Sequence, residues 1–212
     1  MINETHSYVV KKTGEGSFGA LCTVESLESG QSFDLMLRIS DFWDAHLSVG
    51  KTLTDSKFEE LYEKSGVAKA LSLAEGIVSR GSISKKALVQ KLKRLETDKN
   101  HAEKAALIME ERGYIDEDSQ AERMALAFCR RKYWGKRRII AALLEKGYER
   151  DSAFRGADLV PTEEYTAALD AVIERKFPDI PEDKREKDKR IASLLRMGFS
   201  LSEISDAFKR AY

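Results

Sequence analysis

The sequence has few of the residues that build disulfide, metal or catalytic clusters. Its 212 residues include 2 Cys and 3 His. Cys22 and Cys129 lie far apart and without CxxC spacing, which gives no support to a disulfide framework or a zinc site. The histidines lie in different segments, without a nucleophile motif or the HExxH spacing of a zinc enzyme. We therefore expect no bound metal, no cofactor and no enzymatic activity.

Long hydrophobic runs are also lacking. No apolar stretch approaches the roughly 20 residues that cross a bilayer. The start of the chain, Met1 to His6, does not resemble a signal peptide. We expect a cytoplasmic protein that does not contact membranes and that is a monomer.

The chain has no net charge, because 36 basic side chains balance 36 acidic ones. The balance is uneven along the sequence: residues 1–64 hold 11 acidic and 6 basic side chains, which leaves 25 and 30 for the rest. The two segments therefore carry about −5 and +5. Because the net charge of the protein is zero, its total charge does not attract nucleic acid or a membrane. Any such attraction must come from local clusters of charged side chains.

The first 65 residues are expected to form a small antiparallel sheet. Runs at His6 to Lys12, Ala20 to Leu27 and Phe33 to Ile39 are rich in strand-forming residues, and turn residues separate them. The glycine-rich stretch Thr13 to Gly19 could suggest a phosphate-binding loop. No Gly-Lys-Ser/Thr follows it and no helix opens there, so a plain hairpin is favoured.

From Gly66 onward the apolar residues recur at helical spacing. Two short helices are expected before this point, at Ser40–Trp43 and Thr54–Lys64. The later predicted helices are Val67–Arg80, Ser84–Leu95, Asp98–Arg112, Asp118–Tyr133, Lys136–Lys146, Arg150–Leu159, Glu163–Lys176, Lys184–Met197 and Leu201–Ala211. They fall into three groups of three. We expect a mainly α protein with three tandem three-helix units, an elongated or curved helical repeat, after a small N-terminal β-rich segment. The expected divisions are 1–65, 66–115, 116–161 and 162–212.

One short phrase recurs where helices are expected to end: an aliphatic pair, a few other residues, a glycine and an aromatic. It occurs at Ala142–Tyr148 and Ser193–Phe199, and more loosely at Leu107–Tyr114. Glycine after a helical pattern predicts a left-handed C-terminal cap, and the aromatic is expected to fold back on the helix end. A recurring helix ending indicates a recurring helical unit.

The candidate binding residues cluster in nine consecutive positions, six of them cationic and two aromatic. They are Arg130, Arg131, Lys132, Tyr133, Trp134, Lys136, Arg137 and Arg138. Because Gly135 is expected at a turn between two helices, these side chains would fan outward and suit phosphates, acidic protein loops or exposed bases. The alternative is structural: the two aromatics fill the junction and the cations are simply solvated.

Other charged or reactive residues have structural interpretations. The run Glu182 to Arg190 alternates in sign, which favours ion pairs on an exposed helix. Asp116, Glu117 and Asp118 stand at a helix start, where the helix dipole favours acids, and lack the further carboxylates of a calcium loop. Cys129 adjoins the basic cluster but is expected to be a small, partly buried residue rather than a reactive thiol.

The central segment combines three pieces in a fixed order: Gly113-Tyr114-Ile115-Asp116-Glu117, then Gly135-Lys136-Arg137-Arg138-Ile139, then Leu143 with Lys146-Gly147-Tyr148. In this order and spacing the segment resembles the RecX family of recombination regulators. The resemblance covers about Val67 to Tyr212, including the closing Leu195-Arg196-Met197-Gly198-Phe199-Ser200. The chain departs from the family pattern at Lys136, where the family usually has proline, and at Gln120, where it usually has an aromatic residue.

The resemblance implies three tandem three-helix units in a protein that is not an enzyme. It implies binding to the RecA nucleoprotein filament and modulation, most often inhibition, of its ATP hydrolysis and strand exchange in DNA repair and the SOS response. In this interpretation the basic cluster meets acidic RecA surface or DNA phosphates. The alternatives are a protein that binds single- or double-stranded DNA directly through helix-turn-helix-like units, or a helical-repeat adaptor for another protein.

Overall fold

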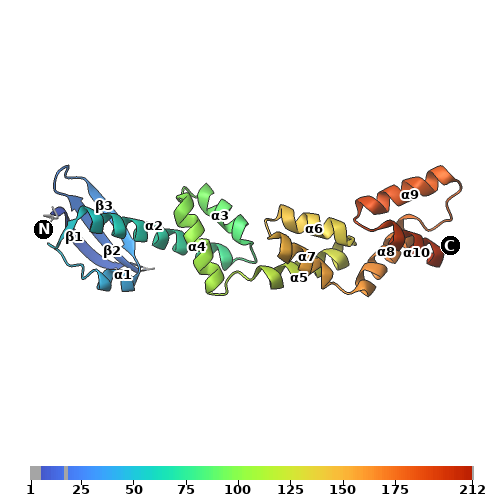
Figure 1. Ribbon diagram of the computed structural model, residues 1–212, viewed down its shortest axis with the longest axis horizontal. Helices are drawn as coiled ribbons and strands as arrows, with labels where there is room; N and C mark the ends of the chain where they lie inside the picture. The colour runs from blue at the N-terminus through green and yellow to red at the C-terminus, as the bar shows by residue number, and fades with distance from the viewer. Residues whose placement is uncertain (1–5, 17–18, 212) are drawn as a thin grey trace. The chain divides into compact units, whose positions relative to one another are not determined.

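The computed structural model describes residues 6–16 and 19–211 (Figure 1). The chain forms two compact units. Unit 1 comprises Met1–Ile83 and Leu88–Ile115, and unit 2 comprises Ser84–Ala87 and Asp116–Tyr212. The fold is mainly helical with a small N-terminal antiparallel sheet, as the sequence predicts.

The sheet of unit 1 has four antiparallel strands in the order β3-β2-β1-β4. They are β1 (His6–Gly16), β2 (Gly19–Ser26), β3 (Ser32–Leu37) and β4 (Thr52–Thr54). The alternation along β2 places Cys22 and Val24 in the core, while Thr23 on the other face donates a hydrogen bond to Asp34 at 2.7 Å. Strand β4 is absent from the prediction because three residues are too few to show an alternation.

The glycine-rich stretch belongs to the β1–β2 hairpin. Gly16 pairs with Gly19 at the end of the antiparallel ladder, and a strand rather than a helix follows. This arrangement confirms the hairpin interpretation, although residues 17 and 18 of the stretch lie outside the described part of the chain. The short helix expected near Ser40 is α1 (Ile39–Asp44).

Helix α2 (Asp55–Val78) is uninterrupted, so the prediction of a separate helix on each side of residues 65 and 66 is wrong. Gly66 suggested the end of a helix. Instead, its missing side chain leaves space for the His101 ring on helix α4 (Lys99–Glu111), because a Cβ at this position would lie 2.1 Å from that ring. Ser65 is buried, and its hydroxyl accepts the Met36 N–H of the edge strand β3 at 2.9 Å. One long helix therefore serves both the sheet and the helices that follow.

The rest of unit 1 is a three-helix arrangement of α2 with α3 (Lys85–Arg94) and α4. Its core contains Leu88 and Leu92 of α3, and Ala105 and Met109 of α4, all fully buried. The last residue of unit 1 is Ile115, and the division predicted at 115/116 remains a prediction.

Unit 2 contains helices whose bounds lie close to the prediction. They are α5 (Glu117–Lys132), α6 (Lys136–Glu145), α7 (Arg150–Asp158), α8 (Thr162–Lys176), α9 (Lys184–Arg196) and α10 (Leu201–Ala211). One continuous core joins them, from Ala121 on α5 to Phe208 on α10. The finer division of this unit at 161/162 therefore remains a prediction.

The recurring glycine phrase forms the predicted left-handed caps. Gly113, Gly147 and Gly198 have φ of 75°, 87° and 95°. The N–H of the residue after each glycine donates a hydrogen bond to the carbonyl five residues before it, as in the Schellman motif. Tyr148 and Phe199 are buried, as expected, whereas Tyr114 is 57% exposed. The copy at Leu107–Tyr114 therefore ends its helix in the same way, but its aromatic residue is not buried.

No helix in the described part of the chain is both long enough and apolar enough to span a membrane.

Candidate partner-binding surface

The predicted basic cluster lies at the turn between α5 and α6. Tyr133 ends α5 with a left-handed backbone (φ 55°, ψ 42°), and its N–H donates to the Cys129 carbonyl at 3.0 Å. Gly135 is the N-cap of α6, and its N–H donates to the Met197 carbonyl at 2.8 Å. The turn is thus fixed by hydrogen bonds on both sides, so the cations on the two helix ends are attached to a rigid support.

Two of the six cations are neutralised by carboxylates. Arg130 donates two hydrogen bonds to Glu164 on α8, one of them at 3.0 Å from Nε, and this contact lowers the pKa of Glu164. Lys136 forms an ion pair with Asp158. Lys136, one of the candidate binding residues, therefore adds no net charge to this surface, because its pair with Asp158 is neutral.

Two other cations lie on the indole ring of Trp134. The Lys132 Nζ is 4.5 Å and the Arg138 Cζ is 4.4 Å from the ring centroid. Arg138 also donates to the Arg196 carbonyl at 3.3 Å. Such cation–π contacts are each worth about 0.5–1 kcal/mol at exposed sites. They hold the two side chains in place without cancelling their charge.

The remaining two cations are unpaired. Arg131 and Arg137 are exposed, and neither forms an ion pair with a carboxylate of the described residues. A further cation, Arg175 in the last turn of α8, lies over the Tyr133 ring with its Cζ 4.9 Å from the centroid. We call Arg131, Lys132, Arg137, Arg138 and Arg175 the basic surface.

The two aromatics are half-buried and support the cations. The Trp134 ring lies 5.1 Å from the Phe128 ring, and both Tyr133 and Trp134 pack against the core of unit 2. Because cations lie over both rings, stacking of a nucleic-acid base there would have to displace them. The site therefore fits a polyanion such as phosphates or carboxylates better than it fits unstacked bases.

Sequence reasoning missed Arg175 and the two carboxylates that pair with cluster cations. Glu164 and Asp158 lie at least 20 positions from their partners, so only the packing of α5, α6 and α8 brings them together. No local signal in the sequence identifies these contacts.

Asp116 of the acidic cluster caps α5, as predicted, whereas Glu117 and Asp118 bind groups on other helices. Asp116 is the N-cap of α5 and accepts the Ser119 N–H at 3.1 Å, and Asp118 pairs with Arg155 at 2.8 Å. The Glu117 carboxylate accepts two backbone N–H groups, from Lys85 at 2.7 Å and Glu149 at 2.9 Å. Among the described residues, no group of three or more His, Cys, Asp or Glu side chains could hold a metal ion.

Cys129 is fully buried, which confirms its structural interpretation. Burial raises the pKa of its thiol to about 11, and the neighbouring Glu164 adds to this rise while Arg130 opposes it. The basic cluster therefore does not activate this cysteine.

The departure from the family pattern at Gln120 is accommodated inside unit 2. Gln120 is 6% exposed, and its amide oxygen accepts a hydrogen bond from the Tyr148 hydroxyl at 3.3 Å. A buried polar group that finds a partner costs little.

Comparison with known proteins identifies relatives of this chain. Residues 163–208 match the family model described as RecX, third three-helix domain. A regulatory protein RecX from Oceanobacillus iheyensis is 22% identical over 184 residues, which cover 86% of this chain and 68% of that protein.

Two solved structures have a similar fold. The crystal structure of a regulatory protein RecX has a TM-score of 0.76 at 17% identity, over 95% of this chain and 99% of that one. RecX from Lactobacillus salivarius has a TM-score of 0.61 at 18% identity, over 69% of this chain and 96% of that one. The C-terminal helices of this chain therefore match the third three-helix domain of RecX, and its fold is similar to that of two RecX crystal structures.

Proposed function

We propose that this chain regulates the RecA recombinase by binding the RecA nucleoprotein filament and lowering its ATP hydrolysis and strand exchange. Its relatives are named regulatory proteins, and the proposed role is regulatory rather than enzymatic. The observation that supports the proposal most strongly is the basic surface, where five cations gather around one turn and none of them forms an ion pair with a carboxylate of the described residues.

The basic surface is suited to an extended, repeating polyanion. A filament offers rows of acidic side chains and DNA phosphates, and several cations can engage such a row together. A ligand that prefers one conformation of the filament slows any step that needs another. Binding of this kind therefore accounts for inhibition without any catalytic group in the regulator.

The direct test is binding to a preformed filament. RecA is assembled on immobilised single-stranded DNA with a non-hydrolysable ATP analogue, and the dissociation constant of this protein is measured. The variant Arg131→Glu/Lys132→Glu/Arg137→Glu reverses three exposed cations, and we expect it to bind at least about 100-fold more weakly.

A charge-matched control separates the surface from total charge. Lys184→Glu/Arg185→Glu/Lys189→Glu makes the same change in net charge on α9 of the same unit, and we expect affinity within about threefold of the wild type. Circular dichroism shows whether both variants keep their helices. Equal losses in the two folded variants, or no loss in either, would remove the basic surface from the proposal.

A direct DNA-binding protein is the second candidate, because the same cations also fit phosphates. It requires affinity for bare DNA that falls steeply with salt and does not depend on RecA. Binding to bare DNA as tight as binding to the filament would favour this candidate.

A further inference from the structure

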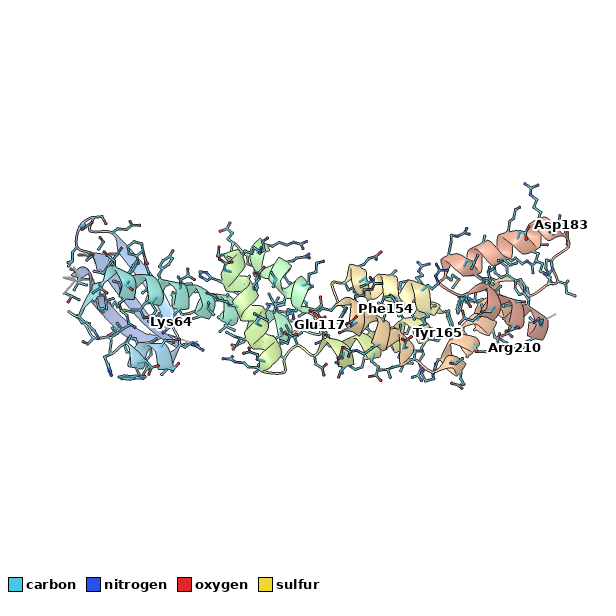
Figure 2. The ribbon with its side chains drawn as sticks, in the orientation of Figure 1. Lys64, Glu117, Phe154, Tyr165, Asp183 and Arg210 are labelled. Atoms are coloured by element: carbon cyan, nitrogen blue, oxygen red, sulfur yellow. The ribbon has the colours of Figure 1, made fainter. Side chains whose placement is uncertain are left out.

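A second surface in unit 2 is an apolar groove whose lining residues do not include those of the α5–α6 turn. It lies between α9, α10 and the connection that precedes α9, and has a volume of about 690 Å³. Figure 2 labels Asp183, the N-cap of α9, and Arg210 near the end of α10. The lining residues are Ile180, Pro181, Lys187, Ile191, Leu201, Ile204, Ser205, Phe208 and Lys209.

The groove has a buried floor and an exposed apolar rim. Ile204 and Phe208 form the floor and are 1% and 8% exposed. Ile180 and Leu201 form the rim and are 69% and 62% exposed. Large apolar side chains that converge on a groove and remain open to water mark a surface that another molecule covers.

The charged side chains that line the groove are both lysines. Lys187 forms no ion pair with a carboxylate of the described residues, whereas Lys209 pairs with Asp206 at 3.0 Å. No carboxylate among the described residues lines the groove. Charge complementarity therefore favours an occupant whose apolar groups are flanked by acids.

The polar groups are too few to orient a small molecule. Among the described residues, Ser205 is the one neutral polar side chain in the lining, and a small-ligand site usually holds several directed donors and acceptors. An apolar groove without such groups is typical of the sites that accept one face of an amphipathic helix.

We propose that this groove binds an amphipathic, acidic peptide segment of a partner protein. Its apolar side chains would pack against Ile204 and Phe208 between the rim residues, and its carboxylates would lie near Lys187. The inference rests on the groove alone and does not depend on the proposed action on RecA.

The test uses a synthetic helical peptide of about 14 residues, four helical turns long, with leucines at helical spacing and glutamates elsewhere. We expect saturable binding to the full chain by fluorescence anisotropy. We expect Leu201→Glu and Ile180→Glu to weaken it at least about tenfold, since each places an acid on the rim. Both residues are exposed, so the fold should tolerate the changes.

The control variant is Leu159→Glu, which makes the same change at a residue of unit 2 that is 61% exposed and does not line the groove. It should bind like the wild type. A second peptide with lysines in place of the glutamates should bind at least about tenfold more weakly at low salt.

Three results would overturn the proposal: no saturable binding of the acidic peptide, equal binding by Leu201→Glu and the wild type, or equal affinity for the acidic and basic peptides. A second copy of this chain is the competing occupant. Self-association of the wild type in sedimentation equilibrium that Leu201→Glu abolishes would assign the groove to that copy instead.

Discussion

Gly135 and Gly198 pack backbone against backbone, so that the start of α6 lies directly on the end of α9. A Cβ on Gly135 would be 2.4 Å from the Gly198 carbonyl carbon, and a Cβ on Gly198 would be 2.4 Å from the Arg138 nitrogen. The Arg137 N–H donates to the Gly198 carbonyl at 3.2 Å. The glycine that caps α9 is therefore also a support for the turn that carries the basic surface.

Gly135→Ala should destabilise unit 2 by about 2–3 kcal/mol, because the new methyl group meets backbone that cannot move aside. Urea unfolding followed by Trp134 fluorescence, with Trp43 replaced by Phe, reports on this unit. Gly76→Ala is the control: it lies inside α2 of unit 1, where the added Cβ has space, and should leave the unfolding of unit 2 unchanged. A Gly135→Ala variant as stable as the wild type would show that the close contact is absent.

Glu117→Ala should cost about 2–4 kcal/mol of the free energy of unfolding, because the Lys85 and Glu149 N–H groups would lose their acceptor. Glu117 is 8% exposed and is labelled in Figure 2. Glu117→Gln keeps one acceptor oxygen and should cost less. Glu122→Ala, an exposed position on the same helix, should change stability by less than about 0.5 kcal/mol. Equal effects of Glu117→Ala and Glu122→Ala would contradict this account of the carboxylate.

Cys129 should be protected from thiol reagents. With its thiol pKa raised to about 11, modification in the folded protein at pH 8 should be at least about 100-fold slower than in denaturant. Mass spectrometry of the labelled peptide measures this. Rapid modification of the folded chain at Cys129 would contradict the buried position.

The Cys129 thiol also makes the free energy of unfolding depend on pH in the alkaline range. Between the ordinary thiol pKa of 9.0 and the folded pKa of about 11, Cys129 ionises in the unfolded chain but stays protonated in the folded one. The free energy of unfolding therefore falls as pH rises through this window. Cys129→Ala should show a smaller fall than the wild type in urea titrations at about pH 8 and about pH 10.5.

Trp134→Leu should weaken filament binding by about 3- to 10-fold without changing any charge. The substitution removes the ring that holds Lys132 and Arg138 but keeps an apolar side chain at the junction. A wild-type affinity in a folded Trp134→Leu variant would mean that the ring does not position these cations.

Much of the helical architecture could be predicted from sequence because its signals are local. The left-handed caps at Gly147 and Gly198, the apolar spacing and the acids at the start of α5 each report a helix end or face directly. The prediction failed at Gly66, where a contact with His101, 35 positions away, overrides the local tendency of glycine to end a helix.

The sequence shows where the candidate binding surface lies, but not which of its cations pair with carboxylates or pack on aromatic rings. The sequence shows six cations around one turn, and it cannot show that Glu164 neutralises Arg130 or that Arg175 lies over Tyr133. These contacts depend on which helices pack together, and that is decided by the core of the whole unit.

The central claim is regulation of RecA, and DNA-dependent ATP hydrolysis by RecA tests it most directly. The rate is measured on single-stranded DNA while this protein is added from a small fraction of the RecA concentration up to equimolar. We expect hydrolysis to fall in a dose-dependent way well below equimolar, and the variant Arg131→Glu/Lys132→Glu/Arg137→Glu to lose most of this effect. A rate that stays unchanged at every ratio would contradict the account.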